Sequence, residues 1–168
     1  NTQNVKTMSS MFSQGAGDYK RDKSGNIISD KFIEDTYNFT GNGIENWDVS
    51  NVTDMSSMFE NHYEFNANLS KWNTSSVVNM NSMFRSCRKF NQNLNTKIIN
   101  FKEEKTNDYI SWNMSNVTDM SNLFYDCNVF DGDISNWNTS KVKNMNNMFE
   151  RCNEFNQNIS KKTVEFKE

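Results

Sequence analysis

The sequence predicts an α/β repeat protein, a solenoid whose coils of about 25 residues each combine a short helix with a short parallel strand. The first observation is a segment that is written four times, opening at Trp47, Trp72, Trp112 and Trp137. The second is the constant step, 25 residues from 47 to 72 and again from 112 to 137. The third is a partial fifth copy at residues 4–12. A fixed period of 20 to 50 residues is typical of solenoids and arrays.

The first half of each copy predicts a short helix. Val52, Met55, Met58 and Phe59 fall at i, i+3, i+6 and i+7, which places them on one helical face. The same positions in the other copies are Val77/Met80/Met83/Phe84, Val117/Met120/Leu123/Phe124 and Val142/Met145/Met148/Phe149. Two residues before each Val stands a serine, namely Ser50, Ser75, Ser115 or Ser140. Serine oxygens cap helix N-termini, so we expect each helix to begin there.

The second half predicts a short parallel strand. The pattern Phe65-Asn-x-Asn-Leu69 recurs at 90–94, 130–134 and 155–159, with Ile in place of Leu in the last two and Asp in place of both Asn at 130–134. We expect the copies to stack at the ~4.8 Å spacing of paired strands. A helix on one side and a strand on the other is, in outline, the geometry of a right-handed leucine-rich-repeat-like solenoid.

Two insertions interrupt the repeat. Between Phe12 and Trp47 lie 22 more residues than between Phe59 and Trp72, and the turn residues Lys23-Ser24-Gly25-Asn26 predict a hairpin or another excursion of the chain there. The step from Trp72 to Trp112 is 40 residues, 15 more than 25. The apolar alternations Ile99-x-Phe101 and Val164-x-Phe166 predict short β segments and extend the repeat, since 47–103 recurs at 112–168. We predict one domain, 1–168, divided into 1–46 (partial coil plus insertion), 47–111 and 112–168.

Composition excludes several functions. The net charge of −3 comes from interspersed acids and bases, which argues against nucleic-acid binding. The apolar runs are too short to span a bilayer, so membrane attachment would need an anchor outside this chain. One histidine and the absence of known catalytic motifs predict that the chain is not an enzyme, with no catalytic residue and no cofactor. Asp and Asn interchange at 54/79/119/144 and at 66/91/131/156, so these side chains are expected to form hydrogen bonds rather than to catalyse.

A column of thiols gives the strongest metal hypothesis. Cys87, Cys127 and Cys152 take one position in three copies, and His62 takes it in the fourth. Zinc needs its ligands around one point, whereas a column spreads four groups over about three steps of ~4.8 Å. We therefore favour small buried side chains over a zinc site or disulfides, and predict no metal.

The tryptophans have two interpretations. Trp47, Trp72, Trp112 and Trp137 could pack at the corner of each coil, or they could form an exposed aromatic platform for sugars or proteins. Their constant spacing favours packing, because a repeat keeps what every coil needs.

The variable positions give the best candidates for partner binding. After each Met-Phe or Leu-Phe comes a segment that differs between copies, at 60–64, 85–89, 125–129 and 150–154. Stacked, these segments form one lateral stripe, which could be an interface or an ordinary solvated face. The insertions at 15–38 and 96–110 are further candidates. The candidate partner-binding residues are His62, Tyr63, Arg85, Arg88, Lys89, Tyr125, Arg151 and the four tryptophans.

The repeat text resembles a known family. Ser-x-Val-x-x-Met-x-x-Met-Phe-x-x-Cys-x-x-Phe-Asn-Gln is similar to the repeat of mycoplasma surface lipoproteins of unknown function. Met-Phe-x-x-Cys-x-x-Phe at 83–90 and 148–155, and at 123–130 with Leu123, also resembles the core of BspA-like leucine-rich-repeat surface proteins. His62 and the 15-residue segment depart from the basic pattern. The resemblance covers the chain except its insertions.

The resemblance implies a location at the cell surface, through a lipid anchor in a longer protein. It implies adhesion or immune interaction, by binding a host or cell-surface protein or glycan, and it offers no catalytic residues to carry over. The alternative is a structural spacer with no ligand of its own.

Overall fold

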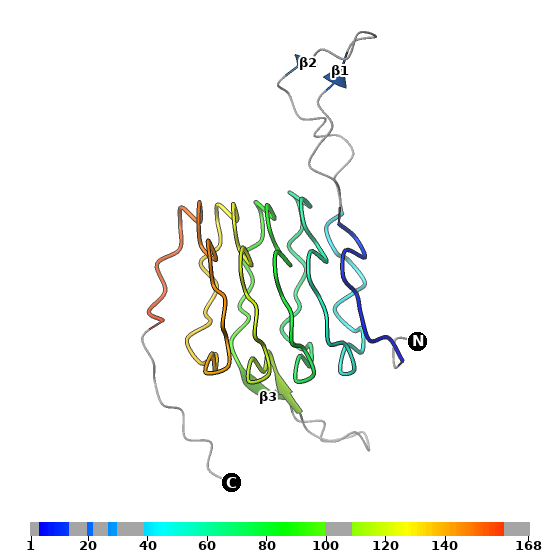
Figure 1. Ribbon diagram of the computed structural model, residues 1–168, viewed down its shortest axis with the longest axis vertical. Coiled ribbons are helices and arrows are strands. Elements are labelled where there is room, and N and C mark those ends of the chain that lie inside the picture. Colours follow the sequence, from blue (N-terminus) through cyan, green and yellow to red (C-terminus); the bar gives the residue numbers. More distant parts are fainter. Residues whose placement is uncertain (1–3, 14–19, 22–26, 30–38, 100–108, 160–168) are drawn as a thin grey trace.

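The protein is a stack of coils lying side by side in chain order (Figure 1). The computed structural model describes residues 4–13, 20–21, 27–29, 39–99 and 109–159. We number the coils 1 (4–13 with 39–46), 2 (47–71), 3 (72–96), 4 (112–136) and 5 (137–159). Isolated parallel β-bridges join each coil to the next and run through Thr7, Asp54, Asn79, Asp119 and Asn144.

The predicted α/β class is wrong. The described residues contain no helix, and hence none that could cross a membrane. Their strands are β1 (Lys20–Arg21), β2 (Ile27–Ser29), β3 (Lys97–Ile99) and β4 (Tyr109–Ser111). These form two antiparallel two-stranded sheets, β1–β2 and β3–β4. The coils are therefore not built from a helix and a parallel strand, and the leucine-rich-repeat geometry predicted from those elements is not found.

The segment predicted to be helical is a series of tight turns. Ser57 and Asn61 have φ values of 53° and 66°, in the left-handed region, which a right-handed helix cannot contain. The Met58 N–H donates to the Met55 oxygen at 3.2 Å, whereas the Phe59 N–H donates to the Met83 oxygen of coil 3 at 2.9 Å. Along this segment, one N–H closes a turn within its own coil and the next N–H donates to the following coil. The left-handed positions recur in the other coils at Ser10, Ser82, Ser86, Asn122, Asp126, Asn147 and Arg151.

Residue chemistry explains these turns. Most left-handed positions carry Asn, Asp or Ser, whose short polar side chains also hydrogen-bond to nearby backbone. An apolar residue at every third position suits a helix and this series of turns equally. The predicted serine caps are also wrong, because no helix begins after these serines in the described residues; in coil 2 the Ser50 N–H belongs to a turn and donates to Asp48 Oδ1 at 3.0 Å.

The predicted parallel strands are not found in the described parts of 65–69 and its equivalents. Side chains join the coils there instead. The N–H groups of Asn91, Asp131 and Asn156 donate to Oδ1 of Asn66, Asn91 and Asp131, at 3.0, 2.9 and 2.9 Å. The parallel bridges lie in the half that was predicted to be helical.

Two columns of phenylalanine rings fill the interior. Phe59, Phe84, Phe124 and Phe149 stack with centroid separations of 5.8, 5.7 and 5.8 Å. The second column consists of Phe65, Phe90, Phe130 and Phe155. Within one coil the two rings also stack, as for Phe124 and Phe130 at 4.0 Å. The core therefore runs without a break from coil to coil.

The insertions leave the stack and return to it at neighbouring points. Phe39 stacks on Phe12 at 4.8 Å, so residues from Phe39 onward complete coil 1. The pairing of β1 with β2 confirms the predicted hairpin. Ile99 lies in β3 as predicted, and Ile98 pairs with Ile110 of β4. Phe101 and the segment Val164–Phe166 lie outside the described residues.

Candidate functional site

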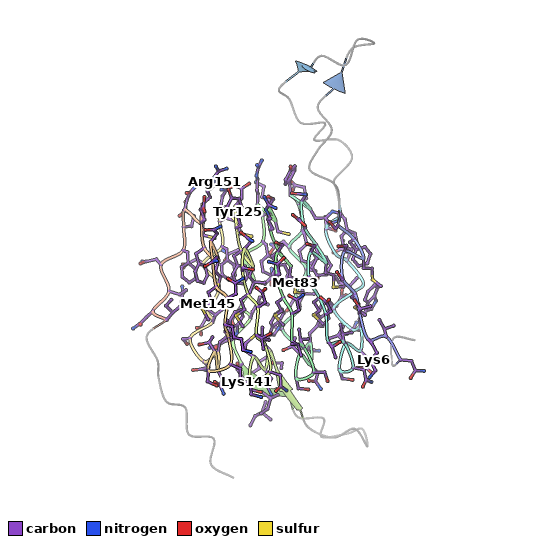
Figure 2. The ribbon with its side chains drawn as sticks, in the orientation of Figure 1. Lys6, Met83, Tyr125, Lys141, Met145 and Arg151 are labelled. Atoms are coloured by element: carbon purple, nitrogen blue, oxygen red, sulfur yellow. The ribbon has the colours of Figure 1, made fainter. Side chains whose placement is uncertain are left out.

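The variable segments gather at one edge of the stack. We call residues 60–64, 85–89, 125–129 and 150–154 the variable stripe. Figure 2 shows Tyr125 and Arg151 at this edge, while Lys6 and Lys141 lie at the opposite edge. The tight turns hold these segments in register, because the Asn61 N–H donates to the Arg85 oxygen at 2.8 Å and the Ser86 N–H donates to the Tyr125 oxygen at 2.7 Å.

Arg85 links coil 3 to both of its neighbours. Its Nη1 lies 3.1 Å from Glu60 Oε1 of coil 2, and its guanidinium lies over the Tyr125 ring of coil 4 at 5.1 Å. One arginine thus contacts an acid on one side and an aromatic ring on the other. Ion pairing and a cation–π contact together restrict the side chain to one orientation.

Arg88 also contacts both neighbouring coils, but its acid lies in coil 4 and its aromatic ring in coil 2. Nε and Nη2 both lie 3.0 Å from Asp126 Oδ2 of coil 4, and the guanidinium lies over the Tyr63 ring of coil 2 at 4.6 Å. Arg151 of coil 5 approaches the other side of the set, 5.6 Å from the Tyr125 ring. The Arg85 and Arg88 side chains remain 44% and 42% exposed, and Lys89 is exposed. Arg85, Arg88, Tyr63 and Tyr125 are therefore held by contacts between coils, and the two arginines remain accessible.

His62 does not belong to this surface. It is 2% exposed, and its Nε2 contacts the Phe12 carbonyl oxygen of coil 1. Burial lowers its pKa below the usual value of 6.5, against a smaller opposite effect of the Phe12 hydrogen bond. The described part of the chain provides no hydrogen-bond partner for its buried Nδ1.

The cysteines form hydrogen bonds between coils. The thiols of Cys87, Cys127 and Cys152 donate to the carbonyl oxygens of Phe59, Phe84 and Phe124, at 3.1, 2.9 and 2.9 Å. His62 contacts the equivalent oxygen of Phe12, which explains why His can replace Cys in coil 2. Sequence reasoning missed this role, because the His or Cys at one position of coils 2–5 indicated a shared donor but not its acceptor in the preceding coil.

The thiols are poorly suited to metal binding or reaction. Burial raises the pKa of Cys87 and Cys127 well above 9.0 and that of Cys152 to about 11. Metals bind the thiolate, which these pKa values disfavour. None of the three cysteines forms a disulfide. Among the described residues no group of three or more His, Cys, Asp or Glu could hold a metal ion.

The tryptophans lie inside the stack to different degrees. Trp72 and Trp112 are buried, whereas Trp47 and Trp137 are half-buried. Nε1 of Trp72, Trp112 and Trp137 donates to the carbonyl oxygens of Ile44, Leu69 and Leu94, at 3.0, 2.8 and 2.8 Å. The indole N–H groups therefore link neighbouring coils. The tryptophans pack inside the stack and are not part of the variable stripe.

The interchangeable Asp and Asn residues do serve as hydrogen-bond acceptors, as predicted. Oδ1 of Asp54, Asn79, Asp119 and Asn144 accepts from the N–H two residues later, at 2.8–3.1 Å. Only an acceptor oxygen is needed for such a turn, and both residue types supply one.

The geometry defines a repeat protein of stacked coils, whose candidate site is a lateral contact surface of arginine, tyrosine and acidic side chains. The chain belongs to the family described as Mycoplasma protein of unknown function, DUF285, which matches residues 26–103 and 96–166. No curated protein and no solved structure matches the chain.

Proposed function

We propose that this chain is a binding module of a bacterial surface protein, which contacts a host or cell-surface protein through the variable stripe. The observation that carries the proposal is the set of Arg85, Arg88, Tyr63 and Tyr125, in which each arginine lies over a tyrosine of another coil while 44% and 42% of the two arginine side chains stay exposed. Arginine and tyrosine dominate the energetics of protein interfaces. Side chains that are already ordered lose less conformational entropy on binding.

Stability alone does not account for this set. Exposed ion pairs and cation–π contacts each contribute about 0.2–1 kcal/mol to folding. A buried phenylalanine contributes several times as much, about 3–5 kcal/mol on truncation to alanine. Since the core supplies most of the stability, the ordered arrangement of the surface arginines supports a role in recognition.

The chemistry of the set favours a protein partner with exposed carboxylates or carbonyls. Arg88 directs Nε and Nη2 to Asp126, and Arg85 directs Nη1 to Glu60. Each guanidinium has further N–H donors beyond these. Lys89 adds an exposed ammonium group. The proposal includes no catalysis, cofactor or nucleic acid.

The cell-surface location in this proposal rests on resemblance. The repeat resembles that of mycoplasma surface lipoproteins, and its Met-Phe-x-x-Cys-x-x-Phe core resembles BspA-like leucine-rich-repeat surface proteins. We propose that a lipid anchor outside this chain holds the module at the surface, and that its binding serves adhesion or immune interaction.

The test is a screen of the chain against purified host matrix proteins, serum proteins and glycans, followed by surface plasmon resonance on each saturable hit. The double variant Arg85→Glu/Arg88→Glu should raise Kd at least ten-fold. Lys141→Glu at the opposite edge is the control for charge and should leave Kd unchanged. If the double variant binds as tightly as the unmodified chain, the variable stripe is not the binding surface. A folded chain that binds nothing would favour the spacer.

A further inference from the structure

Among the described residues, nothing covers the outer face of coil 5. In coils 1–4, alternate N–H groups donate to carbonyl oxygens of the following coil, for example Met120 to Asn144 at 2.9 Å and Phe124 to Met148 at 3.0 Å. The equivalent N–H groups of coil 5 belong to Met145, Asn147, Phe149 and Arg151. They have no acceptor among the described residues. Coil 5 therefore presents a regular row of four donors.

This face is also apolar. A hollow of about 270 Å³ lies on it, lined by Trp137, Met145, Met148, Phe149 and Ile159 among others. Met145 and Ile159 are 42% and 55% exposed, although the equivalent Met120 is fully buried beneath coil 5. A further coil would cover these side chains in the same way.

Coil 1 presents the matching surface at the other end of the stack. In coil 2 the carbonyl oxygens of Asp54, Ser56 and Met58 accept from coil 1 at 2.9, 2.8 and 3.1 Å. The equivalent oxygens of coil 1 belong to Thr7, Ser9 and Met11, followed by Ser13. They have no donor among the described residues. Met11 is 47% exposed at this end.

We propose that the uncovered face of coil 5 binds coil 1 of a second copy of this chain, so that copies add head to tail. The pairs of donor and acceptor residues would be Met145–Thr7, Asn147–Ser9, Phe149–Met11 and Arg151–Ser13. The joint would repeat the contact that the chain already makes between its own coils. It would also place Phe12 of one copy on Phe149 of the other, extending a column with a spacing of 5.8 Å.

Such a joint connects two unlike faces, and it would form a ring only if the rotation from copy to copy closed one, whereas the coils of this chain lie side by side in a row (Figure 1). Each copy uses two different faces, so every addition leaves one free donor face and one free acceptor face. The product is a series of linear oligomers. The inference is independent of the variable stripe, which lies at a lateral edge.

One repulsive contact gives the assembly a salt dependence. In the stack, the Lys143 N–H donates to the Thr118 oxygen at 2.8 Å, and the Thr53 N–H donates to the Lys6 oxygen at 2.8 Å. Lys6 and Lys143 therefore occupy the same column and would become neighbours across the joint. Both are exposed. Added salt screens like charges, so assembly should strengthen with ionic strength.

The experiment is sedimentation velocity on the chain over a hundred-fold range of concentration at low and high salt. We expect a series of species that grows with concentration and with salt. Met145→Arg and Met11→Arg should each be monomeric, since each places a charge on one face. The control is Val78→Arg, because Val78 is 41% exposed but lies on neither end face, and it should assemble like the unmodified chain.

Mixing the two end-face variants gives the decisive result. Met145→Arg retains its coil 1 face and Met11→Arg retains its coil 5 face, so an equimolar mixture should form dimers and nothing larger. Circular dichroism of each variant checks that the stack is intact. A chain that remains monomeric at every concentration, a closed dimer, or a Met145→Arg variant that still grows would each overturn the proposal.

Discussion

Coils 4 and 5 share nearly the same apolar pattern but differ in what they bury. In coil 4, Trp112, Phe124, Cys127 and Phe130 are each fully buried, whereas the equivalent Trp137, Phe149, Cys152 and Phe155 of coil 5 are only half-buried. Coil 4 has a neighbour on both sides, and coil 5 has one among the described coils. The difference shows that a coil obtains its burial from its neighbours, as expected for a repeat protein whose energy is a sum of contacts between adjacent units.

The largest expected effect compares two equivalent phenylalanines. Phe124→Ala should lower the free energy of unfolding by about 3–5 kcal/mol, because it leaves a cavity between two stacked neighbours. Phe149→Ala should cost about half as much or less, since one side of its ring has no stacked partner among the described residues and solvent can fill the space. Urea unfolding followed by tryptophan fluorescence measures both. Equal losses would contradict the dependence on neighbours.

The next comparison concerns the thiols. Cys127→Ala should cost about 1–3 kcal/mol, because it removes a buried group and its hydrogen bond to Phe84. Cys152→Ala should cost less, since Cys152 is half-buried. Cys127→Ser retains a donor at the same place and serves as the control for the hydrogen bond. The same urea titration separates the three variants.

The thiol pKa values add a test by pH. Burial raises the pKa of the Cys127 and Cys152 thiols above 9.0. The stability that these thiols contribute is therefore fully present below pH 9 and is lost as pH rises through their folded-state pKa values. Since Cys152 is half-buried and Cys127 is fully buried, Cys152 should react with iodoacetamide before Cys127 in the native protein. Mass spectrometry of the alkylated protein gives the order, and simultaneous labelling would argue against the difference in burial.

The smallest expected effect concerns pH, and it compares two equivalent side chains that accept a hydrogen bond between coils. Between coils 4 and 5 the acceptor is Asp131, whose pKa is lowered by hydrogen bonds from the Asn156 N–H and the Gln157 amide. A lowered folded-state pKa means that this stabilisation is present above the unfolded-state pKa and lost as pH falls through the folded value. Between coils 2 and 3 the acceptor is Asn66, which does not titrate.

Asp131→Asn should therefore make the stability of the last joint less sensitive to acid while keeping the acceptor oxygen. The measurement is the difference in urea midpoint between pH 7 and pH 3. Glu154→Gln, which removes an exposed carboxylate from coil 5 on the other side of this joint, is the control. A midpoint difference that is the same for Asp131→Asn and the unmodified chain would contradict this role.

The sequence predicted which residues share a column but not the backbone that carries them. Val52, Met55, Met58 and Phe59 are all fully buried, so the period located the interior correctly. A three-residue spacing does not distinguish a helix from repeated turns, and the deciding feature was the Ser and Asn residues at left-handed positions such as Ser57 and Asn61.

The candidate site was predictable only in part. The variable segments indicated the stripe, but the pairing of Arg88 with both Tyr63 and Asp126 needed the coil geometry. His62 was misplaced among the surface candidates because it lies in the variable segment 60–64, although it also takes the position of the buried cysteines. The thiol hydrogen bonds could not be foreseen, since their acceptors lie 28 or 43 residues earlier in the chain.

The two insertions leave and rejoin the stack at adjacent points, with Phe12 against Phe39 and β3 paired with β4. Foreign peptides could therefore be grafted at these two places without shifting the coils on either side. The chain can serve as a display scaffold, because the coils hold both ends of each insertion close together. Sequence change in the loops would alter what the molecule shows to its surroundings at little cost to folding.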